Sequence, residues 1–333
     1  MDDIVALSKA RIERGSKSFS RAAALFDVDT RASAYMLYAW CRHCDDEIDG
    51  QDHGHARAGA GPAACEHVLA KLTEQTTAAV AGRADDPVFI ALSRVVAKHQ
   101  IPAIHPLELL EGFRMDVDRT PYETVEDTLR YSYHVAGVVG VMMAMIMGVR
   151  DRETLNRASD LGIAFQLTNI ARDVVPDARE GRCYLPSDWL ADVGLTSDPS
   201  AVADPNNRQR VFDVTHRLLD RADDYYNSAQ TGIPHLPPRA AWAIAAARNV
   251  YRDIGNVIRQ RGPAAWDTRA YVGKSRQIAG VALGGAQALW LKGSAAIVGS
   301  GAGDRSGLWT HPGLGDATPA GPVEGFGRTT AAE

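Results

Sequence analysis

The sequence has few cysteines, no excess of basic residues and no apolar run long enough to cross a membrane. The four cysteines, Cys41, Cys44, Cys65 and Cys183, form no paired framework, and the N-terminus lacks the apolar core of a signal peptide. The formal net charge is −5, and no basic stripe interleaved with aromatic residues is present. These absences exclude a disulfide-stapled secreted domain and a nucleic-acid-binding protein, so we expect a cytoplasmic protein with no nucleic-acid partner.

Two apolar runs come nearest to a membrane span. Residues 135–149 carry no charge, but as a helix they cover only about 22 Å, less than the roughly 30 Å of a bilayer core. We expect a central packed helix in which Gly137, Gly140 and Gly148 let neighbouring helices approach closely. The second run, 278–291, is shorter and rich in glycine, and we expect it to pack on the protein rather than on lipid.

Alternating β-branched strand patterns are also absent, and apolar residues follow the helical period through most of the chain. No linker or internal repeat divides the helical part, which predicts one all-α domain over residues 1–298. Residues 299–333 are dominated by glycine, alanine, proline and threonine, so we expect a disordered tail that adds little to stability. The predicted helices cover residues 2–14, 30–50, 63–81, 86–99, 105–117, 123–148, 151–175, 206–229, 238–261 and 267–292.

A ladder of oxygen-bearing side chains follows one face of the helix predicted over 151–175 and continues just past its end. Gln166, Asn169, Asp173 and Asp177 recur at spacings of three, four and four residues, with apolar residues between them. Pro176 disfavours helical geometry at the residue before it, so we expect Asp177 to be displaced from this face.

The helix predicted over 30–50 offers a matching set. Tyr38, Arg42, Asp45 and Asp49 recur at spacings of four, three and four residues. Carboxylates in an apolar setting require a cation, and their oxygens suit Mg²⁺, which leaves coordination positions for phosphate. Planar donors that suit a diphosphate leaving group stand beside the acids: Arg42, Arg172 and Arg182. The two helices therefore predict a site for diphosphate ionisation.

Two other interpretations of the region around His43 fail on spacing. Cys41 and Cys44 form a CxxC, but no second CxxC is present, so we expect packing rather than zinc or redox chemistry. His43 beside Asp45 and Asp46 is the pattern of a metal phosphohydrolase, but such an enzyme needs further histidines in register, and none has that spacing.

Four motifs in order carry a resemblance to a known family. They are SKSFS at 16–20, YAWCRHCDDEID at 38–49, YSYHVAG at 131–137 and QLTNIARDVVPDAREGRCYLP at 166–186. This set resembles the squalene and phytoene synthase family over residues 4–292, and the stretch 236–269 is similar to bacterial phytoene synthases. The resemblance implies an isoprenoid synthase fold, a helical bundle around a deep apolar cavity with both acid motifs at its mouth.

The resemblance also implies roles for individual residues. Two Mg²⁺ sites, with Mn²⁺ as an alternative ion, would be formed by Asp45, Asp46 and Asp49 and by Asn169, Asp173 and Asp177. The substrate would contact Lys17, Phe19, Tyr38, Arg42, Gln166, Arg172, Arg182, Tyr184, Tyr251 and Lys274. The residues expected to take part in catalysis are Tyr38, Arg42, Asp45, Asp49, Tyr131 and Asp173. Aromatic rings suit this chemistry because their π faces stabilise a carbocation that water would destroy.

The implied activity is that of a Mg²⁺-dependent prenyltransferase of carotenoid biosynthesis, a phytoene synthase. It would join two geranylgeranyl diphosphates head to head through a cyclopropylcarbinyl diphosphate, and proton loss would end the reaction. No glycine-rich dinucleotide loop is visible, so no NADPH is expected. The hydrocarbon product suggests peripheral membrane contact and other carotenoid-pathway enzymes as partners. The alternatives are a squalene or dehydrosqualene synthase acting on farnesyl diphosphate, a terpene cyclase, and a catalytically idle helical scaffold.

Overall fold

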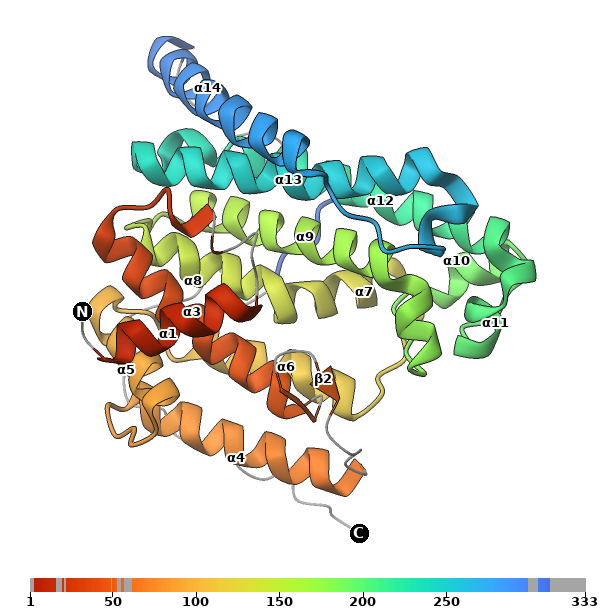
Figure 1. Cartoon of the computed structure of the whole chain (residues 1–333), viewed down its shortest axis with the longest axis horizontal. Coiled ribbons are helices and arrows are strands. Elements are labelled where there is room, and N and C mark those ends of the chain that lie inside the picture. Colours follow the sequence, from red (N-terminus) through yellow and green to blue (C-terminus); the bar gives the residue numbers. More distant parts are fainter. Residues whose placement is uncertain are drawn as a thin grey trace.

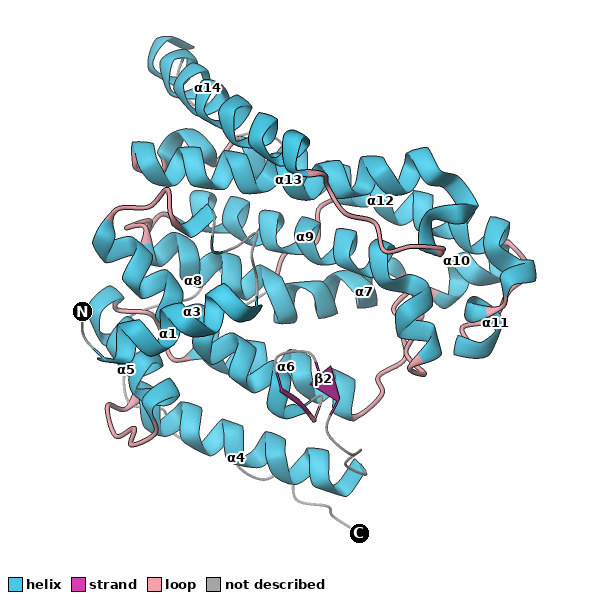
Figure 2. Ribbon diagram, viewed as in Figure 1, coloured by secondary structure: helices cyan, strands magenta, loops and turns pink. Residues whose placement is uncertain are grey.

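The computed structural model describes residues 3–15, 20, 22–48, 50–52, 55–56, 62–298 and 305–311. These residues form a helical bundle (Figure 2). Within these ranges the only strands are β1 (Gln51–Asp52) and β2 (His55–Ala56), which make a short antiparallel pair. The predicted all-α fold class is therefore confirmed.

The N-terminal half contributes helices that enclose one side of the bundle. They are α1 (Asp3–Gly15), α3 (Val28–Ile48), α4 (Pro62–Val80), α5 (Pro87–His99) and α6 (Ile104–Val117). Their ends carry readable signals: at α5, for example, the Asp86 side chain accepts from the Val88 amide at 2.8 Å, and Pro87 occupies the first turn.

The apolar run predicted as a central helix lies in a continuous helical span. This span consists of α7 (Val125–Ser132), the π-helical turn η1 (Tyr133–Gly137) and α8 (Val138–Ile146). By length and composition alone it is long enough to cross a membrane, but 67% of its most apolar window is buried inside the protein. We interpret it as a core helix, in agreement with the sequence.

The C-terminal half supplies the central helix and the layers that cover it. In chain order its elements are α9 (Arg152–Arg179), α10 (Ser187–Asp192), α11 (Pro199–Ala203), η2 (Pro205–Asn207), α12 (Arg208–Gln230), η3 (Ile233–His235), α13 (Pro238–Arg261), η4 (Gly262–Trp266) and α14 (Lys274–Val298). Helix α9 runs through the middle of the molecule, where it contacts α7, η1, α8, α11, α12 and α13 (Figure 1).

Helix α9 is longer than predicted and is not broken at its proline. It begins after Asp151, whose side chain accepts from the Thr154 amide at 2.8 Å, and continues through Pro176 to Arg179. Pro176 lies on the exposed side of the last turn, so its missing amide removes one hydrogen bond where the helix is about to end. The expected displacement of Asp177 is therefore wrong, since Asp173 and Asp177 are one turn apart on an unbroken helix.

The span η1–α8 crosses α9 with backbone against backbone. A Cβ atom on Gly140 would collide with the carbonyl oxygen of Ala158, and one on Gly162 would collide with that of Ala136. Gly137 is also close to α9, but Gly148 has open space around it and instead turns the chain after α8 with a φ of 93°. Two of the three glycines predicted to allow close approach therefore do so.

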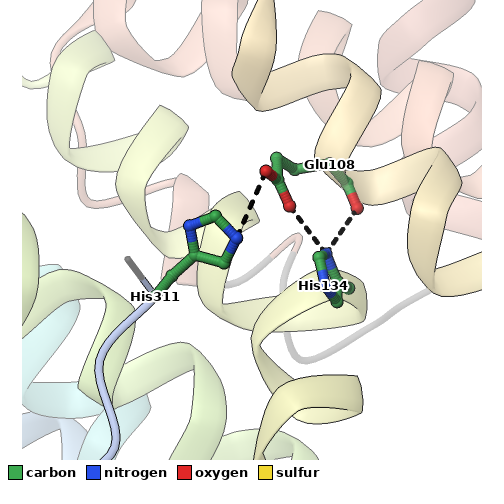
Figure 3. Close-up of side chains that lie close together, drawn as sticks. All are labelled: Glu108, His134 and His311. Carbon is green, nitrogen blue, oxygen red and sulfur yellow. Dashed lines mark hydrogen bonds and ion pairs between the residues drawn. The ribbon is translucent and has the colours of Figure 1, made fainter. Parts of the chain in front are cut away.

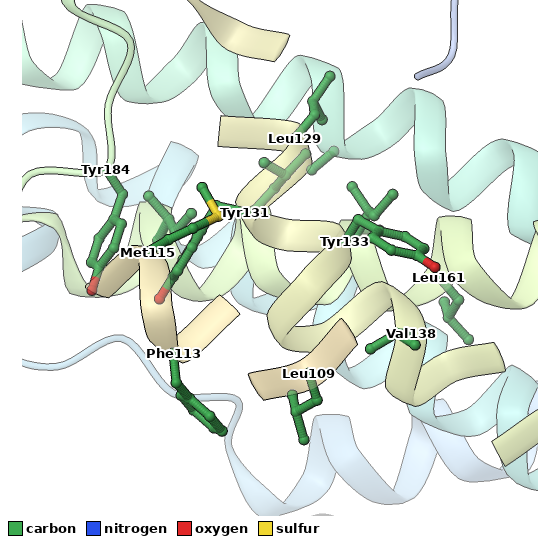
Figure 4. Close-up of a cluster of buried hydrophobic side chains, with 14 of the residues drawn as sticks. Leu109, Phe113, Met115, Leu129, Tyr131, Tyr133, Val138, Leu161 and Tyr184 are labelled. Atoms are coloured by element: carbon green, nitrogen blue, oxygen red, sulfur yellow. The ribbon is translucent and has the colours of Figure 1, made fainter. Parts of the chain in front are cut away.

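Two groups of buried apolar side chains form the core. The larger lies among α3, α5, α6, α8, α9 and α12 and includes Trp40, Phe89 and Leu167; Figure 4 shows the part of it around Leu109, Phe113 and Leu161. The smaller contains Ile12, Phe26 and Leu236 and joins α1 to η3 and α13.

The C-terminal segment 305–311 packs on the bundle. Arg305 Nη2 lies 2.6 Å from the carboxylate of Asp160, which is fully buried on α9. The Trp309 amide donates to the Tyr225 hydroxyl at 3.0 Å. For these seven residues the structure differs from the expected disordered tail, because Arg305 and Trp309 attach this glycine-rich stretch to α9 and α12. The other residues of 299–333 lie outside the described part of the chain.

His311 completes this attachment. Its ring stacks on Tyr133 with centroids 4.5 Å apart, and its Nε2 atom lies 3.3 Å from Glu108 Oε1. The other carboxylate oxygen of Glu108 lies 2.8 Å from His134 Nδ1, so one carboxylate links two histidines (Figure 3). His134 Nδ1 also lies 3.1 Å from the Glu108 carbonyl oxygen, so this nitrogen carries the ring proton and donates it to Glu108.

Candidate active site

A cavity of about 310 Å³ lies between α3, α8, α9 and α13. Most of its wall is apolar and includes Leu37, Val139, Met143, Phe165 and Ile244. On α3 the lining ends at Cys41, and on α9 it ends at Asn169. The carboxylates of both predicted clusters follow within one or two turns along the same helices, so they lie beyond one end of an apolar chamber.

On α3, one arginine holds two carboxylates. Arg42 Nη1 lies 2.8 Å from Asp45 Oδ2, and Arg42 Nη2 lies 2.7 Å from Asp46 Oδ1. The spacing of three and four residues brings these side chains to one face of the helix. Asp46 is largely buried in this arrangement and Asp45 is partly exposed, which leaves Asp45 the more accessible carboxylate.

On α9, Asp173 is the centre of the second cluster. Arg172 contacts both of its carboxylate oxygens, with Nε 3.0 Å from each. Arg269, which follows η4, places Nη2 3.5 Å from Asp173 Oδ2. One turn earlier, Asn169 donates to Gln166 Oε1 at 3.3 Å. The ladder predicted from the sequence therefore exists, and it is joined by an arginine that the sequence reasoning missed.

Asp177 carries the electrostatic signature of this cluster. Burial, and after it the negative charge of Asp173, raise the pKa of its carboxyl to about 7, although Arg182 and Arg172 act in the opposite direction. Two acids one turn apart in a partly dry setting therefore resist being ionised at the same time. This is the environment into which a divalent cation fits.

Aromatic side chains meet the polar end of the cavity. Tyr38 lines the wall, and burial raises the pKa of its hydroxyl to about 12, so it is protonated at neutral pH. Tyr251 from α13 stacks on Phe165 with centroids 4.2 Å apart, and both rings line the cavity. Cys41 also contributes to the lining, and burial raises the pKa of its thiol to about 12, as expected for a packing residue.

Tyr131 and Tyr184 do not line this cavity but form a separate cluster beside it. Their rings stack with centroids 4.8 Å apart (Figure 4), and their hydroxyls donate to Asp116 at 3.0 and 2.9 Å respectively. Burial raises the pKa of Tyr131 well above its usual range, and the Asp116 carboxylate adds to this effect. Asp116, on α6, therefore fixes both phenols as hydrogen-bond donors, and no spacing in the sequence links it to them.

Some predicted site residues cannot be placed. Lys17, Phe19 and Asp49 lie outside the described residues, as does the side chain of Lys274. Arg182 lies close enough to Asp177 to lower its pKa, and its amide donates to the Asp177 carbonyl at 2.9 Å. The structure thus brings together two groups: on α3, Tyr38, Arg42, Asp45 and Asp46; on α9 and its neighbours, Gln166, Asn169, Arg172, Asp173, Asp177, Arg182 and Tyr251.

The donor atoms of the two clusters suit a hard cation. Carboxylates from both helices and the side-chain amides of Gln166 and Asn169 provide oxygen ligands, which Mg²⁺ and Mn²⁺ prefer. The raised pKa of Asp177 gives an independent reason, because positive charge placed beside it would restore its ionised form. The residues present therefore fit divalent ions.

Comparison with known proteins identifies the family. A sequence model of the squalene/phytoene synthase family matches residues 12–276. The chain belongs to the squalene/phytoene synthase family. The predicted resemblance is thus confirmed.

Two members of the family with high sequence identity to this chain are phytoene synthases. The chain is 54% identical over 266 residues to the phytoene synthase of Pseudescherichia vulneris, an alignment that covers 80% of this chain and 85% of that protein. It is 48% identical over 318 residues to the 15-cis-phytoene synthase of Paracoccus sp. (strain N81106 / MBIC 01143), covering 94% of this chain and 99% of that protein. These relatives favour the phytoene synthase interpretation over the farnesyl-diphosphate alternative.

The fold also matches a solved member of the family. A dehydrosqualene synthase crystallised with a ligand superposes with a TM-score of 0.76 at 27% identity, and the match covers 87% of this chain and 97% of that one. The isoprenoid synthase fold that the resemblance implied is therefore confirmed.

Proposed function

We propose that this family member is a phytoene synthase, a Mg²⁺-dependent prenyltransferase that joins two molecules of geranylgeranyl diphosphate at their C1 carbons. The observation that carries the proposal is the apolar chamber whose α3 and α9 walls continue into carboxylate and arginine clusters. A prenyl diphosphate has the same division, with a long apolar chain and a highly charged head. The relatives named as phytoene synthases support this activity.

Arginines and carboxylates at the charged end of the cavity have different roles. Arg42, Arg172 and Arg269 are held at the charged end by Asp45 and Asp173, where their planar donors suit the diphosphate of a substrate and of the leaving group. Divalent ions bound to the carboxylates would act as Lewis acids that assist diphosphate departure. Asp49 would be a further ligand of these ions.

The apolar chamber protects the carbocation that follows. The stacked rings of Phe165 and Tyr251 present π faces to the chamber, which stabilise positive charge and exclude water. Attack of the second molecule's double bond on the allylic cation, with loss of one proton as the three-membered ring closes, gives the cyclopropylcarbinyl diphosphate. Its ionisation and rearrangement join the two C1 carbons, and loss of a proton, rather than hydride addition from NADPH, gives the central double bond of phytoene.

The test is incubation of the full-length protein with C15 or C20 diphosphates and Mg²⁺, without NADPH, followed by mass analysis of the products. We expect a C40 hydrocarbon with the mass of phytoene, together with release of inorganic diphosphate. A C30 product from farnesyl diphosphate in preference would instead favour a dehydrosqualene synthase, and a cyclic C20 product a terpene cyclase. Absence of diphosphate release would favour a scaffold in a carotenoid-pathway assembly. We further propose a cytoplasmic enzyme in peripheral contact with membrane.

A further inference from the structure

The apolar chamber has a far end, opposite the acid clusters, where a charged side chain joins the lining. Along α9 the lining extends from Asn169 back to Thr154, about 22 Å at the rise of an α-helix. Arg157, near the end of this stretch, lines the chamber and is 3% exposed. The turn after α12 lies directly against it, because a Cβ atom on Gly232 would be 2.6 Å from the Arg157 Cβ atom. A prenyl chain that extends from a diphosphate at the acids would therefore have its tail at Arg157.

The guanidinium of Arg157 is held by groups of α9 and α12. Its Nη1 atom donates to the Ser228 hydroxyl at 2.7 Å, and its Nη2 atom lies 3.7 Å from Glu153 Oε1. The Ser228 hydroxyl donates in turn to Asp160, which is fully buried on α9 one turn after Arg157. Arg157 and the buried carboxylate thus share one serine, so the position of the arginine depends on what neutralises the carboxylate.

The charge that neutralises Asp160 comes from the C-terminal segment. Arg305 Nε lies 2.9 Å from Asp160 Oδ2, and Arg305 Nη2 lies 2.6 Å from Asp160 Oδ1. Residues three apart share a helix face, so Arg157 lies on the same side of α9 as Asp160. A buried carboxylate that loses its partner attracts a nearby cation, and in the absence of Arg305 this carboxylate would draw Arg157 toward it. Arg305 therefore keeps Arg157 at the wall of the chamber.

We propose that the C-terminal segment fixes the far end of the substrate chamber, with Arg305 as a positioning residue that acts on Arg157 through Asp160. The proposal rests on the proposed function, because it takes the chamber to hold a prenyl chain. In its observed position Arg157 ends the space available to the chain, so a chain with one more isoprene unit than the substrate collides with it. Without Arg305, the side chain of Arg157 turns toward Asp160, and the chamber becomes longer at this end.

A purely stabilising role of the C-terminal segment would have a different consequence. Arg305 would then change the free energy of unfolding but leave the relative affinities for shorter and longer prenyl chains as they are. Arg248 on α13 offers the matched comparison, because it is also a 3% exposed arginine but lies outside the lining of the cavity. It donates to the Tyr226 carbonyl and to Gln230 Oε1, both at 2.9 Å, so its loss perturbs the core without altering the chamber wall.

The experiment measures the affinity of the full-length protein for unreactive thio-diphosphate analogues with C20 and C25 chains, by calorimetric titration with Mg²⁺ present. We expect the wild-type protein to bind the C20 analogue more tightly than the C25 analogue. Arg305→Met and Arg157→Ala should each reduce this preference by about tenfold, the usual effect of a few methylene groups in an apolar pocket. Arg305→Lys should restore part of the preference, because it returns a positive charge to Asp160. Arg248→Met should leave the preference unchanged.

Thermal unfolding identifies the variants that are folded at the temperature of the titration, and either Arg305→Met or Arg157→Ala alone suffices to decide. The proposal is overturned if the wild-type protein binds both analogues equally, or if the folded variant keeps the wild-type preference. An equal loss of preference in Arg248→Met would overturn it as well. In these three outcomes prenyl diphosphates still bind and the proposed function stands, whereas a wild-type protein that binds neither analogue would contradict the proposed function and this inference with it.

Discussion

Arg305 and Asp160 form a bidentate ion pair between residues 145 positions apart in the sequence. Asp160 is fully buried on α9 and also accepts from the Ser228 hydroxyl, which in turn accepts from Arg157 at 2.7 Å. A buried carboxylate requires such donors, since its desolvation otherwise opposes folding. The C-terminal segment therefore supplies a charge that the centre of the bundle needs.

Arg305→Ala should lower the free energy of unfolding by about 2–3 kcal/mol. The loss stays within this range because Ser228 still donates to Asp160. Chemical denaturation measures it, with Arg179→Ala at an exposed position of α9 as the control. Deletion of residues 299–333, expected from the sequence to have little effect, should destabilise at least as much. Equal stability of wild type and both variants would show that the segment is not attached in solution.

Asp173→Asn should reduce turnover by about 100-fold or more while the protein stays folded. The change keeps the shape of the side chain but removes the charge that Arg172 and Arg269 share. Steady-state diphosphate release and thermal unfolding measure the two effects. The control is Asp224→Asn on α12, an exposed acid that also pairs with an arginine. Near-wild-type turnover of Asp173→Asn at moderate Mg²⁺ would remove the α9 cluster from the site.

Mg²⁺ and diphosphate should bind cooperatively. Asp45, Asp173 and Asp177 place like charges near the end of the cavity, and the diphosphate adds more, so each negative group is tolerated better when a divalent ion is present. Such coupling is reciprocal. Calorimetric titration of an unreactive thio-diphosphate analogue, with and without Mg²⁺, measures it, and Asp173→Asn should reduce the Mg²⁺-dependent gain more than the metal-free affinity. Equal binding without any divalent ion would assign the diphosphate to the arginines alone.

The protein should lose stability as the pH falls from about 6.5 to 4, in part because of His105. Burial, with a smaller effect of His311, lowers the pKa of this imidazole to about 4, although Glu108 acts in the opposite direction. The folded state thus favours neutral His105, so its contribution is complete above the unfolded-state pKa and disappears as the pH approaches the folded-state value. The expected loss is about 3 kcal/mol.

His105→Gln removes this titration and should flatten the dependence of unfolding free energy on pH in that window. His216→Gln on α12, where the histidine is exposed beside Asp220, is the control for the substitution itself. The same slope in wild type and His105→Gln would mean that His105 remains protonated inside the fold.

The helices and the acid ladders were predictable because both depend on local order in the chain. Helical periodicity and capping residues such as Asp86 are visible in sequence, and residues three or four apart must share a helix face. The predicted displacement of Asp177 was wrong because the general preference against proline in a helix was applied to its last turn. At that position Pro176 removes only one hydrogen bond.

Contacts between distant segments were not predictable. Asp116 meets Tyr131 and Tyr184 only after α6, α7 and the loop following α9 come together, and Arg269 reaches Asp173 only because η4 turns the chain back. The π-helical turn η1 likewise has no signal of its own in the sequence. The overall composition of residues 299–333 predicted disorder. It gave no weight to Arg305 and Trp309, whose individual contacts decide the position of residues 305–311.

The crossing of α8 and α9 at Gly140 and Gly162 has a consequence for how such an enzyme can diversify. Both glycines line the cavity as well as the helix crossing, so the distance between these two walls is set by backbone contact rather than by side-chain volume. Substitutions at Leu37, Met143 or Ile244 can lengthen or shorten the chamber by single methyl groups while the helices stay in place. We expect new preferences for substrate chain length to arise by such changes, while the distance between α8 and α9 stays the same. Any side chain at either glycine would instead force the two helices apart and displace the acids of α9.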